Sequence, residues 1–148
     1  REQSDAVRSL SAYSTLELAY RSTSFKVDAT PAPFVLRVDQ PGDRVRKLMA
    51  AYGVSSAAYV TAWNPRSEPT SQAENDAAHA LLLEWIRASG LRYFDGWGRD
   101  PSGQWPPEKS VLILGITREA ACELGRALGQ NAIVFVGSDG VPRLEMLI

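Results

Sequence analysis

The chain has 148 residues, which is enough for one domain with a sizeable hydrophobic core. Its net charge of −1 gives no sign of a nucleic-acid or anionic-membrane partner, and no apolar run approaches the length of a transmembrane helix. The single cysteine, Cys122, excludes an internal disulfide, and with only one histidine, His79, a zinc site is not expected. Carboxylate-bound Mg²⁺ or Ca²⁺ stays open. We therefore expect a cytoplasmic single-domain protein without nucleic-acid or membrane partners.

The N-terminal third is predicted to form a helix, a hairpin and a second helix. Residues 4–20 carry apolar side chains at helical spacing. The segments 22–28 and 34–38 are predicted strands, joined by a proline-rich turn. Asp43 is expected to cap a short helix that ends at Gly53.

A buried strand and the best helix of the sequence follow. The run 56–63 is nearly all apolar, which is typical of a strand covered on both faces. Pro65 ends it, because proline lacks the N–H that a central strand needs. The next helix, 72–89, begins with a capping box formed by Ser71 and Glu74 and carries one apolar stripe.

The C-terminal part is predicted to add four strands and one helix. These elements are strands 91–97 and 111–116, helix 118–128, and strands 132–136 and 143–147. The strand, helix and strand in the middle have the layout of a crossover, which is right-handed if the two strands are parallel. The complete order is α-β-β-α-β-α-β-β-α-β-β. It predicts a single-domain α/β fold, with α+β as the alternative, in which helices pack on a mixed sheet.

Polar residues gather at the ends of these predicted elements. They are Asn64 and Arg66, Asn75, Glu108 and Ser110, and Gln130 and Asn131. Ligands of α/β sheets bind beyond the carboxyl ends of the strands, so the end of strand 56–63 is the expected site. The alternative is that these residues only cap strands and brace turns.

In the site hypothesis each residue has a role. The ligand-binding set is Asn64, Arg66, Asn75, Ser110 and Gln130. Arg66 would pair with an anionic group, and Asn75 lies in the first turn of its helix, where the dipole favours negative charge. Glu108 is the acid–base candidate, because desolvation beside a buried strand would raise its pKa. This single-site hypothesis requires Asn64 and Glu108 to lie close together.

Four short motifs carry a resemblance to a known family. They are Thr61-Ala-Trp-Asn-Pro65, Ala73-Glu-Asn75, Trp105 followed by Pro107-Glu108-Lys109-Ser110, and Gly129-Gln-Asn-Ala132. In this order and spacing they resemble DUF3293, a family of uncharacterised bacterial proteins. The resemblance covers about residues 50–136 and implies a small bacterial protein with no known reaction, and any cofactor stays unknown.

Two classes of function remain open. The first is a domain that binds or modifies a polar small molecule; no nucleophile elbow, phosphate loop or dinucleotide fingerprint indicates which. The second is a regulatory or protein-interaction module, suggested by the exposed-looking Trp97 and Trp105. A homodimer built on an edge strand, 141–147, is also compatible with the sequence.

Overall fold

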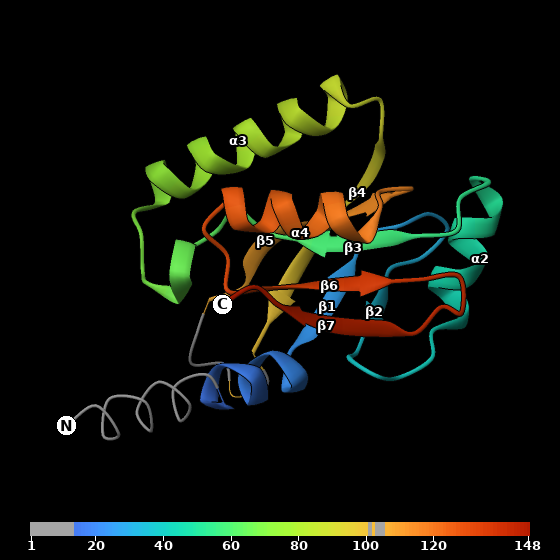
Figure 1. Ribbon diagram of the computed structural model, residues 1–148, viewed down its shortest axis with the longest axis horizontal. Coiled ribbons are helices and arrows are strands. Elements are labelled where there is room, and N and C mark those ends of the chain that lie inside the picture. Colours follow the sequence, from blue (N-terminus) through green and yellow to red (C-terminus); the bar gives the residue numbers. More distant parts are fainter. Residues whose placement is uncertain (1–13, 101, 103–105) are drawn as a thin grey trace.

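The computed structural model describes residues 14–100, 102 and 106–148 (Figure 1). Its strands are β1 (Ser24–Val27), β2 (Phe34–Leu36), β3 (Ala57–Val60), β4 (Arg92–Arg99), β5 (Glu108–Leu114), β6 (Ala132–Val136) and β7 (Pro142–Met146). Its helices are an N-terminal helical segment, 14–22, and α2 (Asp43–Ala51), α3 (Gln72–Ala88) and α4 (Arg118–Ala127), with a short 3₁₀ helix, η1 (Pro65–Ser67). The predicted order of elements is confirmed. The first part of the predicted helix 4–20 and Trp105 lie outside the described residues.

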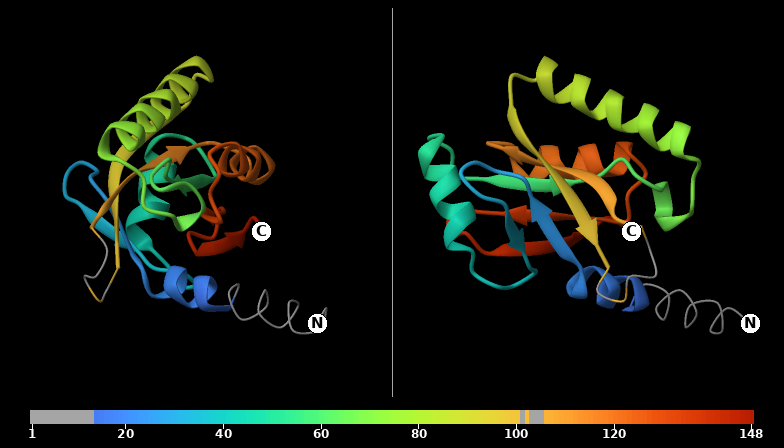
Figure 2. Two further views of the ribbon diagram at one scale, coloured as in Figure 1. Left: turned by 90° about the vertical axis from the view of Figure 1, so that its left-hand side faces the viewer. Right: turned by 180° about the vertical axis from the view of Figure 1, so that it is seen from behind.

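The seven strands form one sheet in the order β2-β1-β4-β5-β3-β6-β7. Every neighbouring pair is antiparallel, so the α+β alternative describes the fold and the expected mixture of pairings does not occur. The physical reason is the place of β3, which lies between β5 and β6 and pairs antiparallel with both. The two strands of the predicted crossover are therefore parallel to each other, but they are not paired. The sheet is curled like half of a barrel (Figure 2).

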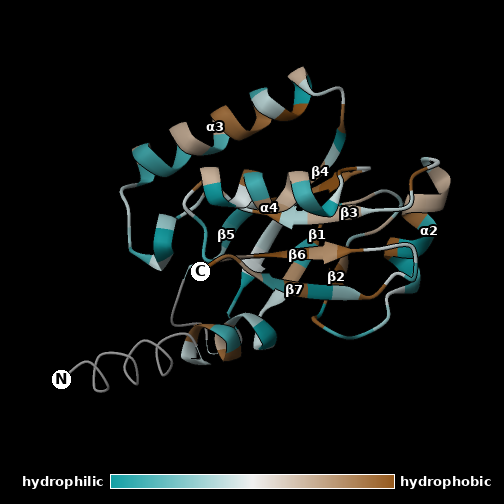
Figure 3. Ribbon diagram, viewed as in Figure 1, coloured by the Kyte–Doolittle hydropathy of each residue, from teal (hydrophilic) through white to brown (hydrophobic). Residues whose placement is uncertain are grey.

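Helices α3 and α4 cover the convex face of the sheet (Figures 1 and 2). Alternate residues of β3 and β5, such as Val60 and Val111, point to this face and pack with Leu82 and Ile86 of α3. Both helices carry hydrophobic and hydrophilic residues, whereas β6 is hydrophobic throughout (Figure 3). The two helices begin as predicted, because Ser71 and Thr117 each accept a hydrogen bond, of 3.2 Å, from a first-turn backbone N–H.

The concave face is closed at one end by α2. Val45 and Met49 of α2 are buried there against Leu36, Val134 and Val136. The helical segment 14–22 lies over the other end of the same face. The two ends differ, because the α2 end is filled with apolar side chains and the other end is not.

The hairpin of β4 and β5 is longer than the sequence pattern predicts. Strand β5 starts at Glu108, three residues before the predicted strand 111–116, and Glu108 is paired with Gly98 of β4. Glu108 and Ser110 are thus residues of the sheet, and both lie on its concave face with Leu112. No helix in the described part of the chain has the length and apolarity needed to cross a membrane.

Candidate functional site

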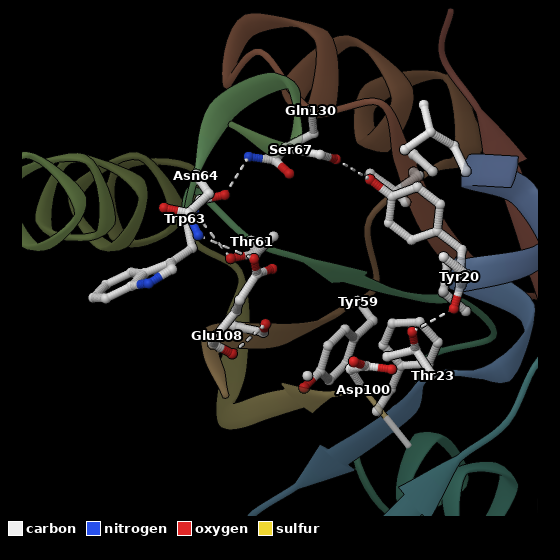
Figure 4. A pocket seen from close by; sticks show the side chains of 18 of the residues that line it. Tyr20, Thr23, Tyr59, Thr61, Trp63, Asn64, Ser67, Asp100, Glu108 and Gln130 are labelled. Carbon is white, nitrogen blue, oxygen red and sulfur yellow. Dashed lines mark hydrogen bonds between the residues drawn. The ribbon is translucent and has the colours of Figure 1, made fainter. Parts of the chain in front are cut away.

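A cavity of about 460 Å³ lies between the concave face of the sheet and the helical segment 14–22 (Figure 4). Six strands, β1 and β3 to β7, contribute residues to its lining, so the curled sheet forms most of the cavity wall. The residues that give it its chemistry are Tyr20, Tyr59, Asn64, Ser67, Glu108 and Gln130. Its volume is in the range of small-molecule pockets.

The polar residues meet at one edge of the sheet because the strands are antiparallel. Asn64 follows the end of β3, whereas Glu108 begins β5 and Gln130 precedes β6. Since β5 and β6 run opposite to β3 on either side of it, their first residues lie beside its last ones. The proximity of Asn64 and Glu108 is confirmed: the Nδ2 of Asn64 donates a hydrogen bond of 3.3 Å to the Oε1 of Glu108.

The loop that carries Asn64 has an unusual backbone. Asn64, Arg66 and Ser67 have φ angles of 45°, 59° and 59°, in the left-handed region that non-glycine residues seldom adopt. Such conformations persist only where surrounding contacts enforce them, and they concentrate at functional sites.

Gly129, Gln130 and Asn131, between α4 and β6, supply many of those contacts. The carbonyl of Gly129 accepts a hydrogen bond of 2.7 Å from the N–H of Arg66. The Nε2 of Gln130 donates to the Trp63 carbonyl at 3.1 Å, and the Nδ2 of Asn131 donates to the Ser67 hydroxyl at 3.1 Å. Gly129 has a φ of 70°, and a Cβ there would lie 3.1 Å from the Cβ of Pro65.

Asn75 holds the same loop from the opposite side. Its Oδ1 accepts a hydrogen bond of 2.9 Å from the Asn64 N–H, and its Nδ2 donates to the Oδ1 of Asn64, also at 2.9 Å. Only 3% of Asn75 is exposed, and it does not line the cavity. Its place in the first turn of α3 therefore positions Asn64, and its side chain is not open to an anion.

Glu108 is a partly buried carboxylate that faces the cavity. Burial raises the pKa of Glu108 from its ordinary value, and the hydrogen bond from Asn64 opposes that change. Within the described residues its Oε2 accepts no hydrogen bond, so one carboxylate oxygen is left for a partner in the cavity.

Two tyrosines shape the cavity, and the sequence pattern did not identify them. The hydroxyl of Tyr20 lies 3.2 Å from the Ser67 hydroxyl, which joins the helical segment 14–22 to the Asn64 loop (Figure 4). Tyr59 crosses Gly96 of β4 and donates a hydrogen bond of 2.9 Å to the carbonyl of Lys26 in β1. Burial raises the pKa of both phenols, so both stay neutral at physiological pH. A lone tyrosine in an aliphatic strand is the one sequence signal for Tyr59.

The remaining predicted residues divide between the cavity and its surroundings. Ser110 and Gln130 line the cavity with Asn64 and Glu108. Arg66 is exposed and does not line it, because the loop turns its side chain outward. Within the described residues, no three His, Cys, Asp or Glu side chains are grouped to hold a metal ion.

The comparison with protein families gives one match. The model of a protein of unknown function (DUF3293) matches residues 60–133, which include Asn64, Asn75, Glu108 and Gln130. No curated protein and no solved structure matches the chain. The matched segment is half of the chain and contains the Asn64 loop with its braces, and on this ground the chain belongs to the DUF3293 family.

Proposed function

We propose that this domain binds a polar small molecule in the cavity under the helical segment 14–22. The observation that carries the proposal is the pairing of Asn64 with Glu108 on the wall of a ligand-sized cavity. The left-handed residues of the Asn64 loop cost stability, and many hydrogen bonds are needed to hold them. Such a loop fits a shape kept for a ligand. The single cysteine fits a reducing cytoplasm, where we expect the protein to act.

The alternative function is a non-catalytic interaction module. It requires that the polar motifs only stabilise turns and strand ends. Asn75 is a brace, and Trp97 is 36% exposed on the other face of the sheet. A cavity beside Asn64 favours ligand binding, because a purely structural cluster has no need to leave such a volume unfilled.

Chemistry on the bound molecule would depend on Glu108. Burial raises the pKa of Glu108, so this carboxyl group holds a proton more readily than an exposed one, which favours a role in proton transfer. Ser67 is a weaker candidate for a nucleophile, since its hydroxyl contacts Tyr20 and Asn131 and neither is a base. We therefore place binding first and acid–base chemistry by Glu108 second.

The test is a thermal-shift screen of the whole chain against amines, amino acids, sugars, nucleosides and divalent metals. A ligand at roughly 100 times its Kd adds about 2.7 kcal/mol of stability, which gives a clear rise in Tm. We expect the rise to disappear in Glu108→Gln and in Ala19→Phe, which narrows the cavity from the helical segment.

The matched control is Glu123→Gln, the same chemical change at an exposed position of α4 on the other face of the sheet. It should keep the full rise. Ligands whose effect survives both cavity variants, or a screen without any hit, would contradict the proposal. If the NMR spectrum of a bound compound changes with time in the presence of wild type but not of Glu108→Gln, the domain also catalyses a reaction.

A further inference from the structure

The hydrogen-bonding groups of the cavity are not balanced between donors and acceptors. Five lining side chains already donate a hydrogen bond to a main-chain carbonyl. They are Thr23 to Ala19, Tyr59 to Lys26, Thr61 to Lys109, Ser110 to Glu108, and Gln130 to Trp63, over 2.7, 2.9, 2.6, 3.0 and 3.1 Å. The four hydroxyl donors are spent within the protein, and the amide of Gln130 keeps one hydrogen.

Hydrogen-bond acceptors remain on the side of these groups that faces the cavity. The Nε2 of Gln130 must be the atom that meets the Trp63 carbonyl, because a carbonyl accepts and only the amide nitrogen donates. The Oε1 of Gln130 is therefore the free end of the amide, and Figure 4 shows it on the cavity side. With the Oε2 of Glu108, it provides a second acceptor without a donor among the described residues.

The donors that remain are few. Asn64 has one spare hydrogen on Nδ2, since the other meets Glu108, and both lone pairs of its Oδ1 are used by Thr70 and Asn75. The hydroxyls of Tyr20 and Ser67 contact each other.

The charged side chains among the described lining residues have one sign. They are Glu108 and Asp100, and none of the described lining residues is Lys, Arg or His. An anionic ligand would meet the Glu108 carboxylate without a cationic side chain from this set, which disfavours a phosphate or a carboxylate. A cation would neutralise Glu108, whose partial burial makes that pairing stronger than one in water.

The rest of the wall is apolar and aromatic. Leu16 and Ala19 of the helical segment and Phe25, Val134 and Leu144 of the sheet line it. A molecule that fills the space needs an apolar body as well as a polar group.

We propose that the cavity is selective for molecules that carry a protonated amine, or another cationic N–H group, on an apolar body. The ammonium group pairs with Glu108, and a further N–H or O–H donor of the ligand meets the Oε1 of Gln130. This inference rests on the proposed function, since it names the chemical class of ligand for the same cavity. It also replaces the expectation of an anionic group paired with Arg66.

The experiment uses matched probes that differ only in the polar group. Phenethylamine, phenylethanol and phenylpropionate form one set, and the corresponding indole compounds form a larger one. Binding to the whole chain is measured by ligand-observed NMR and by thermal shift. We expect each amine to bind about tenfold more tightly than its alcohol, as for a charge-assisted hydrogen bond, and the carboxylate to bind least.

Variants of single residues show which side chain causes the preference for the amine. Glu108→Gln should abolish the preference for amine over alcohol, whereas Glu123→Gln should keep it. An amine preference that persists in Glu108→Gln overturns the inference, as does an alcohol or carboxylate that binds as tightly as the amine.

The failures of the two proposals can be told apart. Alcohols or carboxylates that bind without the amines, and lose their binding in Ala19→Phe, overturn the amine selectivity and leave the cavity as a ligand site. No binding by any member of either set overturns the amine selectivity, and the broader screen then decides the proposed function.

Discussion

The two faces of the sheet are made by the same strands but are filled in different ways. On the convex face, Val60, Val111 and Ile113 are at most 1% exposed beneath α3 and α4. On the concave face, β5 changes from Leu112 and Leu114 at one end to Ser110 and Glu108 at the other. The strand alternation is unbroken, so the change along one face of β5 marks where packing gives way to a cavity.

The difference separates the residues that stabilise the fold from those available to a ligand. Burial of apolar side chains by α3 and α4 is the dominant stabilising term on the convex face. At the cavity end of the concave face, partly buried polar groups and three left-handed residues oppose stability. Substitutions on the convex face should therefore lower mainly the free energy of unfolding, and substitutions at the cavity should change mainly the affinity for the ligand.

The largest expected effect comes from Leu82→Ala on the convex face. Leu82 is 1% exposed, and its truncation should lower the free energy of unfolding by about 2–5 kcal/mol, because it leaves a cavity in packed core. Ligand affinity should stay unchanged. Leu144→Ala is the matched substitution on the concave face, where Leu144 already borders an open volume.

The loss of stability in Leu144→Ala should be the smaller of the two, and ligand affinity should change. Urea unfolding of both variants gives the stabilities, and NMR titration gives the affinities. Equal stability losses, or an affinity change confined to Leu82→Ala, would contradict the difference between the faces.

A smaller effect is expected for Asn75→Ala, which connects the two faces. The substitution removes the three hydrogen bonds that Asn75 makes to Asn64 and Thr70, and leaves the Asn64 N–H without its acceptor. We expect a loss of about 1–3 kcal/mol and weaker ligand binding. Asp76→Ala is the control, since its ion pair with Lys109, at 3.8 Å, is exposed.

Asp76→Ala should change the free energy of unfolding by less than about 1 kcal/mol and leave binding intact. Should Asn75→Ala behave in the same way in urea unfolding and NMR titration, Asn75 would not be the brace that the hydrogen bonds indicate.

The sequence pattern predicts most elements well because local signals set them. The expected cap by Asp43 is wrong, since Gly42 is the N-cap of α2 and no side chain caps this helix. The capping residues Ser71 and Thr117 and the buried run of β6 depend only on near neighbours. The convergence of Asn64 and Glu108 was also predicted, but from the rule for the carboxyl ends of parallel strands. The physical cause is different, because β5 begins beside the end of an antiparallel β3.

What the sequence pattern missed depends on contacts between distant segments. Tyr20 reaches Ser67 across 47 positions of the chain, and Tyr59 of β3 reaches Lys26 of β1, which lies beyond β5 and β4 in the sheet. The outward turn of Arg66 follows from three positive φ angles that no short motif specifies. Which polar residues share a cavity therefore depends on the strand order and on the packing of the helical segment 14–22, and short sequence motifs specify neither.

The smallest expected effect is a gain in stability in Glu108→Gln without ligand. The raised pKa means that folded Glu108 holds its proton more tightly than the unfolded chain, so wild-type stability falls as pH rises from the unfolded value of 4.5 through the folded pKa. Below pH 4.5 the carboxyl is protonated in both states, and wild type and Glu108→Gln should have similar Tm values.

Above the folded pKa of Glu108 the variant should be the more stable protein, because it removes a partly buried charge and can still accept the hydrogen bond from Asn64. Tm values measured across this pH range, with Glu123→Gln as control, test the sign. A wild type that is more stable than Glu108→Gln at neutral pH would mean that the Glu108 carboxylate stabilises the fold. The opposite sign means that the protein retains at Glu108 a charge that its folding does not need, which is the expected cost of a group kept for a ligand.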